Sequence, residues 1–289
     1  MQDVAVPVPG GHINVWHRPS RDDAGTAVLV HGLSGNSRWW STVIEHLPEP
    51  LGLIALDIRG RGLSTDSPPP FDLSTIADDI AGCLDHFGLD GAVVAGYSMG
   101  AWIVALFGVH HPDRTERLVL IDGGLPMPRD PELAPEAFID AMVGPALHRL
   151  EIEFETEEAF FDNWKAHPAL ERHWEDSMKV GLGHELVRDN DHFRVRANPE
   201  AIEITAREIT VGEAANTAAA KLEVPTHLIV VERGTSDQPG GMIPLEVAKE
   251  ASGANRLLTM QYLPDINHYT LILGKGALPV AAAIAPTDN

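Results

Sequence analysis

Short apolar runs alternate along the chain with longer stretches in which apolar residues recur at helical spacing. The runs are rich in Val, Ile and Leu without strict alternation, as is typical of strands buried on both faces of a parallel sheet. They are Ala27–Val30, Leu53–Leu56, Ala92–Ala95, Leu118–Ile121, Leu228–Val231 and Leu257–Leu263. Helical spacing occurs in Trp39–Leu47, Leu73–Phe87, Ala101–His110, Pro244–Ala251 and Tyr269–Ile284. The alternation predicts an α/β fold with a mostly parallel central sheet flanked by helices. An earlier pair of runs, Val4–Val8 and Ile13–Trp16, predicts an antiparallel hairpin at the sheet edge.

One long interval departs from this alternation. From about Met127 to Ala215 no run typical of a buried strand occurs, and acidic residues mix with apolar and aromatic ones, some at helical spacing. We therefore expect a helical cap inserted at residues 127–215, between core segments at 1–126 and 216–289.

Composition and charge narrow the class of protein. A chain of 289 residues that is 44% hydrophobic can bury a full core. Its formal net charge of −21 repels phosphate backbones and anionic lipid, so we expect neither a nucleic-acid partner nor a membrane partner. The single Cys83 cannot form an intramolecular disulfide, and residues 1–11 do not resemble a signal peptide, so a cytoplasmic location is expected.

The most informative motif is Gly96-Tyr97-Ser98-Met99-Gly100, between the predicted strand Ala92–Ala95 and the predicted helix Ala101–His110. A serine at a sharp turn from strand to helix, with glycines two residues away on each side, is typical of a catalytic nucleophile. The motif therefore predicts acyl-transfer chemistry at Ser98. The competing interpretation is an ordinary turn or a phosphate-binding loop.

A second segment fits the same chemistry. His31-Gly32-Leu33-Ser34-Gly35 ends the predicted strand Ala27–Val30, where a backbone N–H can point at a substrate oxygen. We expect the N–H groups of Leu33 and Met99 to form an oxyanion hole, which stabilises the negative charge that develops on that oxygen. His31 is interpreted as a loop-fixing residue and not as a base.

These motifs together resemble the α/β-hydrolase family, specifically its serine esterase and lipase-like members with a helical cap. The residues that carry the resemblance are His31-Gly32, Asp57-Ile58-Arg59-Gly60-Arg61-Gly62-Leu63-Ser64, the motif around Ser98, Leu118–Asp122, and Asn267-His268-Tyr269. The resemblance covers nearly the whole chain outside the expected cap. It implies that Asp57, Arg59 and Ser64 belong to a structural loop.

A serine hydroxyl needs a neighbouring base that accepts its proton and an acid that orients the base. The layout of the family implies that His268, which follows the predicted strand Leu257–Leu263, lies over Ser98. The acid is less determined. We favour Asp237, because the family usually has an Asp soon after the strand that corresponds to Leu228–Val231. The usual spacing from Pro225 leads to Gly234, and Asp237 follows shortly after it in a loop that looks extended. Asp122 and Glu232, each at the end of a predicted strand, are the alternatives.

The expected function is hydrolysis of a small to medium, partly apolar carboxylic ester through an acyl-enzyme, with an ester-like small molecule as partner. Alternatives are a lactonase, a hydrolase of carbon–carbon bonds of the meta-cleavage product type, a cofactor-free haloperoxidase or perhydrolase, and a non-catalytic receptor. Family members that act on haloalkanes or epoxides use a carboxylate nucleophile, which Ser98 does not supply. The acidic composition favours neutral esters over strongly anionic ones.

Neither a cofactor nor a metal is expected, because the sequence contains no His-Glu-x-x-His motif and no paired cysteines. The oligomeric state, monomer or homodimer, stays open. Aromatic and Met side chains of the expected cap either line an apolar pocket, together with Trp39 and Trp40, or pack the cap on the core. They are Phe138, Met142, Phe160, Phe161, Trp164 and Trp174.

Overall fold

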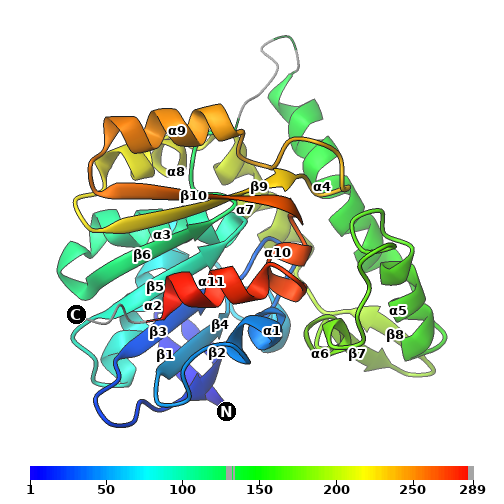
Figure 1. Cartoon of the computed structure of the whole chain (residues 1–289). Helices are drawn as coiled ribbons and strands as arrows, with labels where there is room; N and C mark the ends of the chain where they lie inside the picture. The colour runs from blue at the N-terminus through cyan, green and yellow to red at the C-terminus, as the bar shows by residue number, and fades with distance from the viewer. Residues whose placement is uncertain (128–131, 133, 286–289) are drawn as a thin grey trace.

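A single sheet of eight strands dominates the computed structural model, which describes residues 1–127, 132 and 134–285. The strand order is β1-β2-β4-β3-β5-β6-β9-β10 (Figure 1). The strands are β1 (Gln2–Val8), β2 (Gly11–Arg18), β3 (Thr26–Val30), β4 (Gly52–Asp57), β5 (Ala92–Tyr97), β6 (Thr115–Ile121), β9 (Thr226–Arg233) and β10 (Leu258–Asn267). β1 and β2 pair antiparallel at one edge, and β2 also pairs antiparallel with β4. The remaining strands of this sheet, in the order β4-β3-β5-β6-β9-β10, run parallel to one another. The predicted α/β class, the parallel sheet and the edge hairpin are confirmed.

Helices cover both faces of the sheet. One face packs against α2 (Leu73–His86), α3 (Met99–His110), α8 (Glu213–Ala218) and α9 (Leu245–Ala254). The other face packs against the short helices η1 (Ser37–Trp40) and α1 (Ser41–Ile44), and against α10 (Thr270–Leu273) and α11 (Ala277–Ile284). No helix among the described residues is both long and apolar enough to cross a lipid bilayer.

The predicted C-terminal helix Tyr269–Ile284 is divided in two, so that prediction is wrong in detail. The chain leaves helical geometry at Gly274, whose φ and ψ are −147° and −136°. A Cβ atom at Gly276 would lie 2.6 Å from the Cα atom of Leu271, so the turn between α10 and α11 requires a residue without a side chain there. Helical spacing alone does not reveal this close approach.

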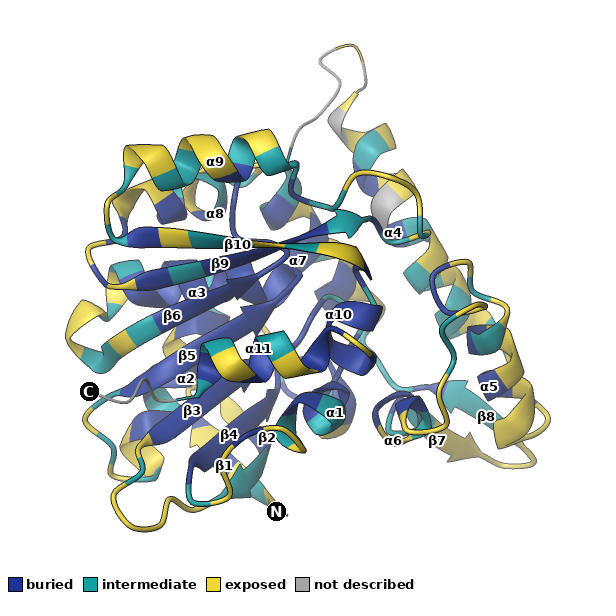
Figure 2. Cartoon of the chain, in the orientation of Figure 1, coloured by how far each residue is buried: buried dark blue, intermediate teal, exposed yellow. Residues whose placement is uncertain are grey.

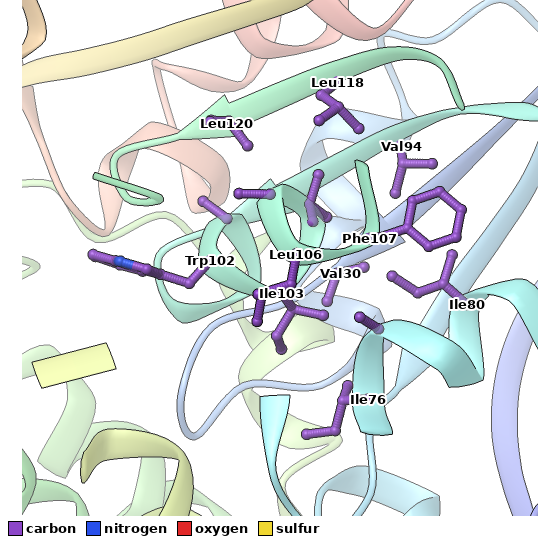
Figure 3. Close-up of a cluster of buried hydrophobic side chains, with 14 of the residues drawn as sticks. Val30, Ile76, Ile80, Val94, Trp102, Ile103, Leu106, Phe107, Leu118 and Leu120 are labelled. Atoms are coloured by element: carbon purple, nitrogen blue, oxygen red, sulfur yellow. The ribbon is translucent and has the colours of Figure 1, made fainter. Parts of the chain in front are cut away.

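Helix α3 is central to the core. Every residue from Met99 to Gly108 is buried, because sheet, α2 and α8 surround the helix (Figure 2). Trp102, Ile103 and Phe107 pack among side chains of the neighbouring strands and of α2 (Figure 3). Burying each of these large side chains contributes roughly 1.5–3 kcal/mol, so the helix that follows Ser98 is held firmly.

Most of the chain between β6 and β9 projects beyond the sheet, whereas its last helix packs on core helix α3 (Figure 1). It contains α4 (Pro135–Glu151), α5 (Glu157–Lys165), α6 (Met178–Gly183), β7 (Leu186–Asp189), β8 (His192–Val195), α7 (Pro199–Val211) and α8. The expected helical insertion also contains two strands, β7 and β8, which form an antiparallel hairpin turning at Asn190 with φ of 54°. The expected boundary at Ala215 falls within α8, which packs on core helix α3. Residues 127–215 are called the cap segment below.

Candidate active site

Ser98 occupies the sharp turn between β5 and α3. Its φ of 55° and ψ of −127° are a strained conformation for a residue with a side chain. A Cβ atom at Gly96 would lie 2.2 Å from the carbonyl oxygen of Gly100, and one at Gly100 would lie 2.3 Å from the carbonyl oxygen of Val30. Both glycines of the motif are therefore required sterically, which explains why the sequence pattern identified this turn.

His268 lies beside Ser98, as predicted. Its Nε2 atom is 3.1 Å from Ser98 Oγ. Two backbone contacts hold the histidine: its N–H donates to the carbonyl oxygen of Arg233 at 3.1 Å, and its own carbonyl oxygen accepts from the Tyr97 hydroxyl at 2.9 Å. Burial, with smaller contributions from nearby Tyr269 and Asp122, raises the pKa of Tyr97 well above its ordinary value, so this hydroxyl remains a donor.

The carboxylate beside His268 belongs to Asp122, so the prediction of Asp237 is wrong. Asp122 Oδ2 lies 2.7 Å from His268 Nδ1, and the Asp122 side chain is fully buried. Asp237 Oδ1 instead accepts from Arg233 Nε at 2.8 Å and from Asn267 Nδ2 at 3.0 Å. The Glu232 carboxylate, the other alternative, accepts from the backbone N–H of Asp265 at 2.7 Å.

Pairing between neighbouring strands explains why Asp122 reaches the histidine. The N–H of Ser98 donates to the carbonyl oxygen of Ile121 at 2.8 Å, so the end of β6 lies directly against the turn that carries Ser98. The loop after β9 folds back on itself, because the N–H of Gly234 donates to the carbonyl oxygen of Gln238 at 2.9 Å. Asp237 is thereby kept beside Arg233, four residues earlier.

The two expected oxyanion donors are placed at the same site. Leu33 and Ser98 line one cavity, and a Cβ atom at Gly32 would lie 3.0 Å from Ser98 Cβ, so the Leu33 loop touches the serine. Met99 begins α3, where the first N–H groups have no partner within the helix. In the described part of the chain neither N–H donates a hydrogen bond. Neither amide is therefore engaged by another group of the described chain.

His31 contributes to the shape of this loop. Its Nε2 atom accepts from the N–H of Ile58 at 3.2 Å, and its Nδ1 atom lies 2.7 Å from the carbonyl oxygen of Gly32. Complete burial lowers the pKa of His31 to about 4, so the ring is neutral at pH 7. This agrees with the predicted loop-fixing role.

The predicted structural loop is also found. Asp57 Oδ1 and Oδ2 accept from the N–H groups of Ser37 at 2.7 Å and Leu63 at 2.9 Å. Ser64 Oγ donates to the carbonyl oxygen of Asp57 at 2.7 Å. Arg59, fully buried, pairs with Asp79 at 2.6 Å. These contacts stabilise the loop that follows β4, next to the site.

A cavity of about 830 Å³ lies over Ser98 and His268, between the sheet and the cap segment. Of the aromatic side chains considered from sequence, Phe138 and Trp39 line it. The remainder mostly pack in the core: Trp40, Phe160, Phe161 and Trp164. Trp174 lines a separate, smaller cavity, and the side chain of Met142 lies outside the described structure.

Sequence reasoning missed two charged groups of the cap segment. Arg149 lines the cavity, and its Nη2 atom donates to Ser34 Oγ at 3.1 Å. Glu185 is buried beside it, accepts from Trp39 Nε1 at 2.9 Å, and has its pKa raised to about 7 by burial. No sequence motif marks either residue, because both reach the site through packing of the cap segment. In the described ranges, no group of three or more His, Cys, Asp or Glu side chains is arranged to hold a metal ion.

Part of this sequence is similar to the sequences of named proteins. RutD of Caulobacter sp. (strain K31), a proposed carbamate hydrolase, is 30% identical over 108 residues, which cover 37% of this chain and 40% of RutD. The soluble epoxide hydrolase of Corynebacterium sp. (strain C12) is 35% identical over 95 residues, which cover 33% of each protein. The chain therefore spans less than half the length of these relatives.

Solved structures match over nearly the full length. The crystal structure of E-2-(acetamidomethylene)succinate hydrolase superposes with a TM-score of 0.77 at 20% identity, covering 98% of this chain and 99% of that one. The thioesterase domain from the curacin biosynthetic pathway superposes with a TM-score of 0.73 at 16% identity, covering 99% of both chains. At such identities the similarity shows a shared fold.

The family described as having the alpha/beta hydrolase fold matches residues 27–181, which is more than half of the sequence. The chain therefore belongs to the α/β-hydrolase fold family.

Proposed function

We propose that the protein is a serine hydrolase that cleaves a carboxylic ester through an acyl-enzyme. The observation that carries the proposal is one continuous contact series. Ser98 Oγ lies 3.1 Å from His268 Nε2, and His268 Nδ1 lies 2.7 Å from Asp122 Oδ2. This arrangement activates a serine hydroxyl, and a cavity above it has room for a substrate.

In the first half of the reaction, His268 Nε2 takes the proton from Ser98 Oγ, which attacks the acyl carbon. The N–H groups of Leu33 and Met99 stabilise the oxyanion. The leaving oxygen then takes the proton from Nε2 as the carbon–oxygen bond breaks. Throughout, Asp122 accepts from Nδ1–H, which keeps the ring oriented and stabilises its positive charge.

In the second half, a water molecule gives a proton to His268 Nε2 and attacks the acyl-enzyme. The tetrahedral intermediate collapses, the acid product leaves, and the proton returns to Ser98 Oγ. A carbamate, as the name of RutD suggests for that protein, would follow the same steps. An epoxide would not, because its opening in this family uses a carboxylate nucleophile where this chain has Ser98.

Covalent labelling tests the nucleophile, and turnover tests the activity. We expect a fluorophosphonate to form one adduct, located on Ser98 by peptide mass spectrometry. A series of p-nitrophenyl esters of increasing chain length, with lactones, carbamates and a vinylogous diketone beside them, then identifies the reaction. Ser98→Ala and His268→Ala should each lower kcat on the order of a millionfold.

The exposed residues Ser20 and His46 provide matched controls, since Ser20→Ala and His46→Ala remove the same groups far from the cavity. Preferred turnover of the diketone would replace ester hydrolysis by carbon–carbon cleavage. Absence of both labelling and turnover would favour a non-catalytic receptor.

A further inference from the structure

The charge inside the cavity is opposite to that of the molecule. The protein carries a net charge of −21. Among the described residues that line the cavity, none is Asp, Glu or Lys, and Arg149 is the one arginine. Burial, together with Arg149, lowers the pKa of His167, another lining residue, and so disfavours the charged form of its ring. A cavity kept free of carboxylates in so acidic a protein suits a negatively charged ligand.

Arg149 is held in position but not neutralised by an ion pair. It lies in the last turn of α4, its Nη2 atom donates to Ser34 Oγ at 3.1 Å, and its guanidinium stacks 4.4 Å from the ring centre of buried Trp164. Within the described residues no carboxylate lies within 4.0 Å of it, and its Nε has no hydrogen-bond partner. By contrast, Arg194 and Arg207 of the same segment each pair with a carboxylate.

Glu185 is a buried carboxylate that interacts electrostatically with Arg149. Its Oε1 atom is occupied by Trp39 Nε1 at 2.9 Å. Because burial raises its pKa to about 7, Glu185 is only partly ionised at neutral pH and offsets the charge of the guanidinium only in part. A ligand carboxylate in the cavity would therefore be attracted by the Arg149 guanidinium.

The guanidinium lines the same cavity as Ser98 and His268. Ser34, which it contacts, follows Leu33, the proposed oxyanion donor. On its other side, Trp164 lies 5.7 Å from the ring of Tyr269, and Tyr269 lies 5.7 Å from the ring of His268. Because both groups face one cavity, a substrate with its ester at Ser98 can direct a second group toward Arg149.

We propose that the substrate is an ester that carries a carboxylate, and that Arg149 is the specificity-determining residue that binds this carboxylate. The planar guanidinium fork matches a carboxylate, and such charge-assisted hydrogen bonds are stronger than neutral ones. This inference rests on the proposed serine hydrolase function and replaces the expectation of a neutral ester. The alternative is that Arg149 only joins α4 to the Ser34 loop.

A matched pair of substrates separates these roles. Mono-p-nitrophenyl succinate and p-nitrophenyl butyrate share chain length and leaving group, and differ in ending with a carboxylate or a methyl group. We expect the wild type to prefer the succinate in kcat/KM, after subtraction of spontaneous hydrolysis. Arg149→Gln should lower the ratio of succinate to butyrate kcat/KM on the order of 10- to 100-fold, mainly through the KM of the succinate.

Two further variants sharpen the test. Arg149→Lys keeps the charge without the fork and should restore part of the ratio, and it replaces Arg149→Gln if that variant fails to fold. Arg188→Gln is the control, since Arg188 also lies near an aromatic ring of the cap segment, 5.7 Å from Phe193, but does not line the cavity. Its ratio should equal that of the wild type.

The possible failures are distinguishable. If the butyrate is turned over but the ratio is the same in wild type and Arg149→Gln, the carboxylate proposal is wrong and the hydrolase proposal stands. If neither ester is turned over and Ser98 forms no adduct, the hydrolase proposal is wrong. Calorimetric titration of the protein with monomethyl succinate then tests the carboxylate proposal. Weaker binding of monomethyl succinate to Arg149→Gln than to the wild type supports this proposal, and equal or absent binding overturns it.

Discussion

The Asp122 carboxylate and the His268 ring meet at 2.7 Å, on the side of the ring opposite Ser98. The proposed acid therefore lies at the end of β6, the strand that pairs directly with β5 before Ser98. Because both strands end at the same edge, the serine and the carboxylate are positioned by one pair of hydrogen-bonded strands. The site depends less on the longer loop after β9 than the prediction of Asp237 implied.

The Asp122 assignment predicts a large difference between two isosteric variants. Asp122→Asn should lower kcat about ten thousandfold, because the amide no longer favours the required ring tautomer. Asp237→Asn should change kcat less than about tenfold, since Asp237 forms a partly exposed pair with Arg233. Steady-state kinetics on a p-nitrophenyl ester measures both. A larger loss in Asp237→Asn would reverse the assignment.

The Tyr97 hydroxyl is expected to act as a positioning group. Tyr97→Phe removes its hydrogen bond to the His268 carbonyl oxygen, so kcat should fall by a factor of about 2 to 10 with little change in KM. The unfolding free energy should fall by about 1 kcal/mol. Tyr262→Phe, at an exposed position of β10, is the control for a lost hydroxyl. Loss of stability without loss of kcat would assign Tyr97 a purely structural role.

Gly123 is expected to be indispensable for the turn at Ser98. A Cβ atom there would lie 2.3 Å from the Ser98 carbonyl oxygen and 2.8 Å from Trp102 Cζ3. Gly123→Ala should destabilise the protein by roughly 1–3 kcal/mol and displace the nucleophile, with kcat falling at least about a hundredfold. Urea unfolding and ester kinetics measure these effects.

Gly253→Ala is the comparison for Gly123→Ala. A Cβ atom at Gly253, in α9, would meet nothing within 4 Å, so alanine should leave kcat unchanged and raise stability by up to about 1 kcal/mol. Similar behaviour of the two variants would mean that the close approach at Gly123 is readily relieved.

Glu185 should make stability depend on pH. Its pKa is raised by burial from 4.5 to about 7, so between these values the folded state binds more protons than the unfolded state. Stability from this group is therefore present below pH 4.5, declines as pH rises, and is lost above about pH 7. The decline amounts to roughly 3 kcal/mol.

Glu185→Gln removes this dependence. Relative to the wild type, its unfolding free energy should increase steadily between pH 4.5 and 7. Urea unfolding at several pH values measures the difference, and Glu200→Gln, at an exposed position, controls for the loss of one charge. A difference that stays constant with pH would show that Glu185 is already ionised below this range.

Features encoded by neighbouring residues were predictable. The strands from Ala27–Val30 to Leu228–Val231 appear as apolar runs because both faces of the sheet are covered, and Gly96 and Gly100 mark the turn because a Cβ atom would collide with the backbone. The acid was predicted incorrectly, because three carboxylates follow strands and local pattern does not distinguish them. Arg149 and Glu185 carry no local pattern at all.

The sequence by itself determined the α/β class and the turn that carries Ser98, since each depends on periodicity or on residues within a single turn. The pairing of Ser98 with His268 was implied by the resemblance to the α/β-hydrolase family. Only the tertiary structure decided that Asp122 serves His268, because strand order places β6 beside β5 and Arg233 retains Asp237. It also decided that Arg149 faces the cavity, because α4 is placed by packing against α7, a helix distant from it along the chain.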